Sequence, residues 1–163
     1  MLSEFQNVLW VMKSGAFKAT SYNLFLTREK VILAKLCTHK SPVASAFTLK
    51  STKKAVAIGG AIGGVAVRNR QKTLEKAVEV AKMPIDKVVE VDKDNFEITK
   101  SEIKKVKLLR KGLLKNIVML EIETKDKKYK WQVMGIPGQE ECKFEDVEAI
   151  IRSSFSNNVE VRT

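Results

Sequence analysis

The chain has 163 residues, 44% of them hydrophobic and 30% charged, which fits a single domain with an added segment. Its formal net charge of +11 favours polyanionic partners such as nucleic acid, anionic lipid headgroups or an acidic protein. A lysine- and glutamate-rich surface that only keeps the protein soluble is the alternative. The two cysteines, Cys37 and Cys142, lie far apart, which excludes a disulfide framework and a structural zinc site.

The sequence shows no targeting or membrane-spanning segment. It starts without the charged and apolar regions of a signal peptide. The longest uncharged apolar run, residues 55–67, has 13 residues, whereas a membrane-spanning helix needs about 20. We therefore expect a cytoplasmic protein, whose contact with a membrane would be peripheral.

The first clear structural pattern is a pair of apolar runs, residues 22–27 and 31–36, on either side of a polar break. Such a pair predicts a β-hairpin, with Arg28 and Lys30 at its turn. Upstream, residues 5–12 are apolar enough to be buried, but helix and strand fit them equally well.

Residues 41–83 predict a long helical insertion with glycines in its middle. Ser41-Pro42 suits a helix start, and Pro84 is expected to end the helix. Within residues 73–82 one helical stripe is apolar, which predicts a face packed against the rest of the protein. The residues of this stripe are Leu74, Ala77, Val78 and Ala81.

After Pro84 the apolar spacing becomes that of β-strands. Short strands are predicted at residues 95–98, 104–111, 117–123 and 128–133. In the last of these, Tyr129, Trp131 and Val133 share one face, which indicates a sheet with one solvated side.

The last predicted element is an amphipathic helix over residues 144–155. Such a helix can cover the open end or edge of a sheet. Residues 157–163 are expected to form a polar tail. The order of hairpin, helical insertion, strands and terminal helix predicts an α+β fold.

Residues 22–34 read YNLFLTREKVILA, and residues 96–122 carry the spaced apolar positions of several strands. Both stretches resemble pleckstrin-homology-like and GRAM-like domains of prokaryotic type, with residues 144–154 in the place of their closing helix. The resemblance implies one PH-like domain over residues 1–163, an antiparallel split barrel with a C-terminal capping helix and the insertion 41–83 after the first clear hairpin. It also implies binding of phospholipid headgroups or peptides, without catalysis.

A basic stretch lies in residues 100–130, where eleven lysines and arginines stand against four acidic residues. Lys105, Lys107 and Lys111 share one face of a regular strand and can bind phosphates as point charges. This stripe supports an alternative function, nucleic-acid binding. The competing interpretation is a solvated outer face of the sheet, whose lysines discourage edge pairing.

Four glycines lie in the middle of the predicted insertion: Gly59, Gly60, Gly63 and Gly64. Their spacing matches neither a P-loop nor a dinucleotide-binding fingerprint. Residues four apart share a helix face, so the two pairs suit close packing against another backbone, including that of a second copy. A break between two helices and contact with a membrane surface are the alternatives. The nearby Arg68, Arg70 and Lys72 are candidate contacts for anionic lipid.

No catalytic constellation can be assembled from the sequence. The only histidine, His39, lies two residues after Cys37, so a thiolate–imidazole pair on one strand face is conceivable. No third group that would orient this pair can be identified. We therefore predict a non-enzymatic binding or assembly module without cofactor or metal, which contacts an anionic lipid surface or forms a homo-oligomer.

Overall fold

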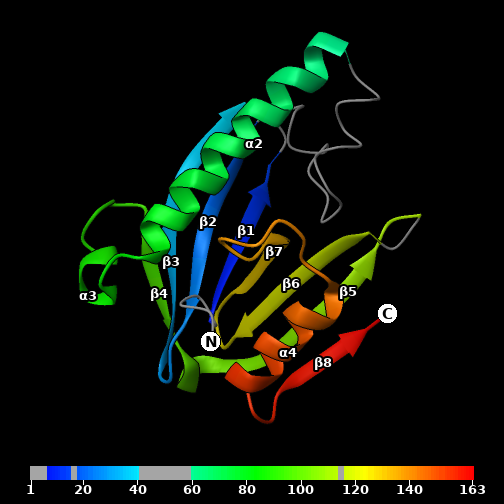
Figure 1. The fold of residues 1–163 in the computed structure, drawn as a ribbon. Coiled ribbons are helices and arrows are strands. Elements are labelled where there is room, and N and C mark those ends of the chain that lie inside the picture. Colours follow the sequence, from blue (N-terminus) through cyan, green and yellow to red (C-terminus); the bar gives the residue numbers. More distant parts are fainter. Residues whose placement is uncertain (1–6, 16–17, 41–59, 114–115) are drawn as a thin grey trace.

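The structure is a computed structural model, which describes residues 7–15, 18–40, 60–113 and 116–163. Its eight strands form one sheet in the order β4-β3-β2-β1-β7-β6-β5-β8 (Figure 1). The strands are β1 (Val8–Ser14), β2 (Lys18–Leu26), β3 (Lys30–Lys40), β4 (Phe96–Thr99), β5 (Ile103–Lys111), β6 (Ile117–Thr124), β7 (Lys128–Gly135) and β8 (Val159–Arg162). The helices are α2 (Gly60–Ala81), α3 (Ile85–Val88), α4 (Phe144–Ser154) and the 3-10 turn η2 (Lys100–Glu102).

The sheet is open and mixed, so the prediction of a PH-like antiparallel split barrel is wrong. Strands β4 and β8 lie at its two edges, and β8 runs parallel to β5. The error lies partly in residues 157–163, which were expected to be a polar tail. Val159 and Val161 lie half-buried against the core, while Glu160 forms ion pairs with Lys105 and Arg162. This alternation makes the segment an edge strand.

One face of the sheet, called here the inner face, carries the main apolar core. This core joins β1–β7 to α4, and its largest fully buried side chains include Trp131, Leu9, Leu24 and Leu120. Helix α4 contributes Phe144, Val147 and Ile151, as its predicted amphipathic stripe requires. The predicted terminal helix is therefore confirmed as an element, although a strand follows it.

The outer face of β1–β3 is covered by α2, so these strands are buried on both sides. All of Val8–Met12 in β1 is buried, and so are residues 23–26 of β2 and 31–34 of β3. A strand that is covered on both faces has a continuous run of apolar residues. This explains why the apolar residues at the start of β1 do not alternate as they do in a half-exposed strand. The predicted hairpin is confirmed as β2 and β3, with Leu24 paired to Leu33.

Helix α2 supplies part of the predicted insertion 41–83; residues 41–59 lie outside the described residues. Ala77 is fully buried with Leu74 packed beside it, and Ala81 packs in the neighbouring cluster, so these three positions of the predicted stripe are confirmed. Val80, and not the predicted Val78, completes the packed face. Inside this seam the Asn23 side-chain amide donates a 2.6 Å hydrogen bond to the Ala77 carbonyl. Figure 1 shows that the first turns of α2 reach beyond the ends of β1 and β2.

Candidate anion-binding site

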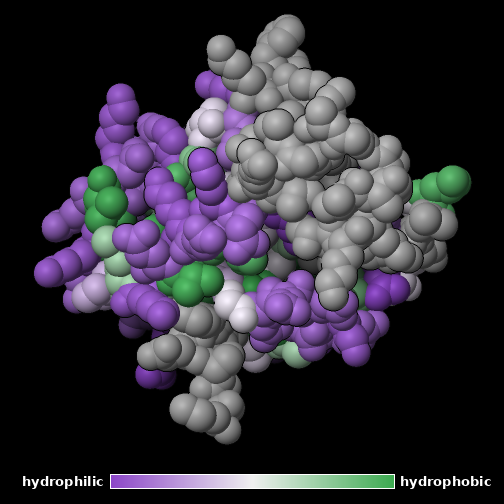
Figure 2. Space-filling model, turned by 45° about the horizontal axis from the view of Figure 1, so that its top comes forward, coloured by the Kyte–Doolittle hydropathy of each residue, from purple (hydrophilic) through white to green (hydrophobic). Residues whose placement is uncertain are grey.

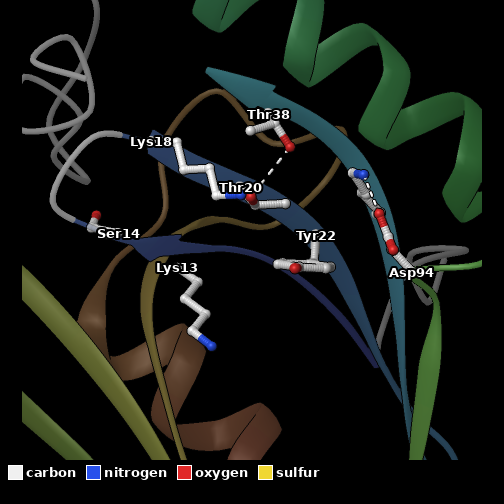
Figure 3. A pocket seen from close by; sticks show the side chains of 9 residues that line it. Lys13, Ser14, Lys18, Thr20, Tyr22, Thr38 and Asp94 are labelled. Atoms are coloured by element: carbon white, nitrogen blue, oxygen red, sulfur yellow. Dashed lines mark hydrogen bonds and ion pairs between the residues drawn. The ribbon is translucent and has the colours of Figure 1, made fainter. Parts of the chain in front are cut away.

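A pocket of about 270 Å³ lies on the inner face, where the apolar core ends toward the β1–β2 hairpin (Figure 3). Three lysines, three hydroxyl groups, one phenol, one glycine and one carboxylate line it. These residues are Lys13, Ser14, Gly15, Lys18, Thr20, Tyr22, Lys35, Thr38 and Asp94. The chemistry of the lining is thus cationic and rich in hydrogen-bond donors.

Strand register brings these side chains together. Thr20 in β2 lies between Lys13 in β1 and Thr38 in β3, and the Thr20 and Thr38 hydroxyls are 3.2 Å apart. Tyr22, two residues further along β2, pairs with Lys35. Because alternate residues of a strand share a face, Thr20 and Tyr22 both point into the pocket (Figure 3).

The single carboxylate of the pocket is bound to one of its lysines. Asp94 forms an ion pair with Lys35, whose hydrogen bond lowers the pKa of that carboxyl. The same bond raises the pKa of the Lys35 ammonium. Burial raises the pKa of the Tyr22 phenol, which stays neutral and serves as a donor. Since Asp94 is paired with Lys35, the ammonium groups of Lys13 and Lys18 are the charges that can contact an incoming anion.

This arrangement is suited to bind an anion. Ammonium and hydroxyl groups around one concavity suit a phosphate or carboxylate, which accepts several hydrogen bonds at once. The pocket therefore has the character of a binding site.

A larger hollow of about 670 Å³ lies between the β2–β3 turn and α3, and it is less suited to an anion. Arg28 and Lys30, the basic residues predicted at the hairpin turn, both line it. Four carboxylates line it as well, and Lys30 is bound to Glu97 at 2.7 Å. Four carboxylates against two basic side chains make the lining net negative, which disfavours an anion.

The predicted basic stripe lies on the outer face of β5, and acidic residues of the neighbouring strand lie opposite its lysines. Lys105 and Lys107 do share this face, opposite Glu123 and Glu121 of β6. Glu121 is 4% exposed and accepts 3.0 Å ion pairs from Lys128 and Lys130 of β7.

The β8 edge adds a further acid, because Glu160 forms an ion pair with Lys105. Lys111, at the end of β5, is exposed. Lys105 is thus held in an ion pair and Lys107 lies opposite a buried glutamate, which weakens these two lysines as a phosphate-binding surface.

The basic residues of α2 are not gathered at the pocket. The Arg70 guanidinium lies 5.4 Å from the Trp10 ring centroid, and burial lowers its pKa. It therefore contributes to the packing of α2 on the sheet. Lys72 is exposed, and the side chain of Arg68 lies outside the described part of the structure.

The glycine segment is helical where it is described. Gly60, Gly63 and Gly64 fall in the first turns of α2, which continues without interruption to Ala81. Gly63 and Gly64 therefore do not break α2. Gly59 lies outside the described residues.

Sequence reasoning missed the pocket because its lysines are spread over three strands. Lys13 and Lys18 lie on either side of Gly15, and a single glycine is only a weak indication of a hairpin turn. Because residues 5–12 fitted helix and strand equally well, this turn was not predicted. Lys35 and Thr38 belong to one strand but face the pocket together only because the register shifts between Ser21 and Tyr22. No local pattern announces that shift.

No family model matches the sequence, and neither a curated protein nor a solved structure is significantly similar to it. Among the described residues, no helix has the length and apolar character needed to cross a membrane. In the same part of the chain, no three His, Cys, Asp or Glu side chains are grouped to hold a metal ion. A function must therefore be argued from the pocket itself.

Proposed function

We propose that the protein is a non-enzymatic binding module that contacts an anionic membrane surface through the lysine–hydroxyl pocket. The observation that carries this proposal is the convergence of Lys13, Lys18 and Lys35 with three hydroxyl groups on one concavity. Such a lining complements the phosphate of a lipid headgroup in charge and in hydrogen bonding.

The charge and polarity of the protein suit contact with a charged surface rather than with an apolar one. In the view of Figure 2 the described surface is mainly hydrophilic, and its apolar residues lie in separate patches. The overall charge of +11 draws the protein toward anionic lipid over about a Debye length. The hairpin lysines, Lys13 and Lys18, then supply the short-range contacts.

Vesicle sedimentation tests the proposal. The full chain is mixed with neutral phosphatidylcholine vesicles, and with vesicles that also contain an anionic phospholipid. We expect binding to the anionic vesicles only, and its loss as salt concentration rises. Lys13→Gln with Lys18→Gln should weaken it by about thirty-fold, since each lysine near the surface contributes about 1 kcal/mol.

A matched control separates the pocket from general charge. Lys125→Gln with Lys127→Gln removes the same charge from the exposed β6–β7 turn. This control variant should bind within about three-fold of the wild type. Equal weakening by the two double variants would show that net charge alone drives binding, and the pocket assignment would then fail.

Nucleic-acid binding is the alternative function, and one further variant distinguishes it. A gel shift with duplex and single-stranded DNA would detect it. If the chain shifts DNA but ignores anionic vesicles, and Lys111→Gln weakens the shift, the outer face of β5 is the binding surface. The ladder of ion pairs on β5–β7 argues against this outcome.

A second candidate role, self-association through α2, is favoured by the unbroken helix that contains Gly60 and Gly64. A glycine pair spaced by four on a continuous helix lets a second backbone approach closely. Gly60→Leu with Gly64→Leu should then lower the mass measured by light scattering from dimer to monomer. A wild-type monomer, or an unchanged mass in the folded variant, would reject this role.

A further inference from the structure

A cluster separate from the pocket lies on the outer face of β3, in the seam with α2. Cys37 and His39 are two residues apart on this strand, and both are half-buried. The Cys37 sulfur is 3.0 Å from Nε2 of His39. Strand alternation brings the two side chains to the same face, so their contact follows from the backbone.

The third member of the cluster comes from the helix. The buried Thr73 of α2 places its hydroxyl oxygen 3.4 Å from the Cys37 sulfur and 3.3 Å from His39 Nε2. Because this hydroxyl carries a single proton, it can donate either to the Cys37 sulfur or to His39 Nε2. The sequence could not show this group, because it lies 36 residues from Cys37.

Two basic side chains lie on α2 on either side of Thr73. Three residues before it, Arg70 lies over the Trp10 ring. Three residues after it, the Lys76 ammonium donates to the carbonyl of Leu36, the residue before Cys37. Cys37 is therefore a half-buried thiol beside an imidazole, in a seam that also carries two cationic side chains.

The other cysteine of the chain provides an internal reference. Cys142 is 8% exposed, and burial raises the pKa of its thiol to about 12. A thiol in that state is inert at neutral pH. The same protein thus contains a shielded cysteine and one that contacts an imidazole.

We propose that Cys37 is a modification site, at which His39 activates the thiol for exchange with a low-molecular-weight disulfide. His39 Nε2 accepts the thiol proton, and the Cys37 sulfur attacks one sulfur of the disulfide. The S–S bond of the reagent breaks as the new S–S bond forms, so the Cys37 sulfur is oxidised and the departing sulfur is reduced. The departing thiolate takes up the proton from the imidazolium, which restores neutral His39.

Intact-mass spectrometry of the full chain with excess oxidised glutathione tests the site. We expect one glutathione per chain at neutral pH, which a reducing agent removes. Cys37→Ser should gain none, and Cys142→Ser should react at the wild-type rate. His39→Gln should slow the reaction by about ten-fold or more, because the proton acceptor is lost.

A comparison of folded and unfolded wild type keeps the test independent of any variant. In guanidinium chloride both cysteines are free of their neighbours and should react equally. An activated Cys37 reacts faster in the folded protein than in the unfolded chain, although folding half-buries it. Slower reaction of Cys37 in the folded protein, or glutathione on Cys142 first, would overturn the proposal. A wild-type rate in folded His39→Gln would also overturn it.

Discussion

The two halves of the sheet use their outer faces in opposite ways. On β1–β3 the outer face lies under α2, where Met12 and Leu36 are each 2% exposed. On β5–β7 the outer face meets solvent and carries alternating lysines and glutamates. The inner faces of both halves nevertheless share one apolar core. The difference is therefore in what covers each half, and it shows in the apolar pattern of the strands.

The distribution of charge follows the same division. In the β5–β7 half, several lysines lie against acids of neighbouring strands, as Lys128 and Lys130 lie against Glu121. In the β1–β3 half, Lys13 and Lys18 reach a pocket whose one carboxylate, that of Asp94, is bound to Lys35. The number of lysines in a segment is thus a poor guide to binding, because strand register decides which of them face acids.

The largest expected effect comes from placing a carboxylate on the outer face of each half. Met12→Asp, under α2, should lower the free energy of unfolding by about 3 kcal/mol or more, because it buries an unpaired charge. Leu109→Asp, on the half-exposed outer face of β5, should cost about 1 kcal/mol. Urea denaturation measures both values. Equal losses would contradict the assignment of a covered half and a solvated half.

An intermediate effect is expected from Glu121, the acid of the charge ladder. Burial raises its pKa, but hydrogen bonds from Lys130 and Lys128 outweigh burial, so the pKa lies below its ordinary value of 4.5. The ionised carboxylate therefore stabilises the fold at any pH above its ordinary pKa. This stabilisation is lost as the pH falls through the lower pKa of the folded state. Glu121→Gln should cost about 1 to 2 kcal/mol at pH 7 and progressively less in acid.

The control for this prediction is Glu123→Gln, one pair along the same ladder. Glu123 faces Lys105 and Lys128 but is half-exposed, so its replacement should cost less than about 0.5 kcal/mol. Denaturation curves measured from pH 7 down to about pH 3 give the comparison. A constant difference between wild type and Glu121→Gln across this range would disprove the assigned role of that carboxylate.

The smallest effect is expected at an ion pair on the surface of α4. Arg152 and Glu148 are one turn apart on α4, with 2.8 Å between guanidinium and carboxylate. Arg152→Ala should change the free energy of unfolding by about 0.5 kcal/mol or less, and high salt should remove the difference. A loss of stability as large as that of Glu121→Gln would show that burial does not determine how much an ion pair contributes to the free energy of unfolding.

The sequence by itself determined the local elements with strong periods. The alternation of Tyr129, Trp131 and Val133 and the stripe of residues 144–155 both predicted the faces that are buried. Charge also followed directly from composition. These features are local, since a strand or an amphipathic helix shows its buried face through the spacing of its own apolar residues.

Only the tertiary structure decided the architecture and the sites. Residues 159–162 became a strand because β5 offered a parallel edge, and β1 lacked a period because α2 covers its second face. The pocket needs register across β1, β2 and β3, and the Cys37 cluster needs Thr73 from the helix. Each of these outcomes depends on contacts between segments distant in the chain, which no local spacing of residues encodes.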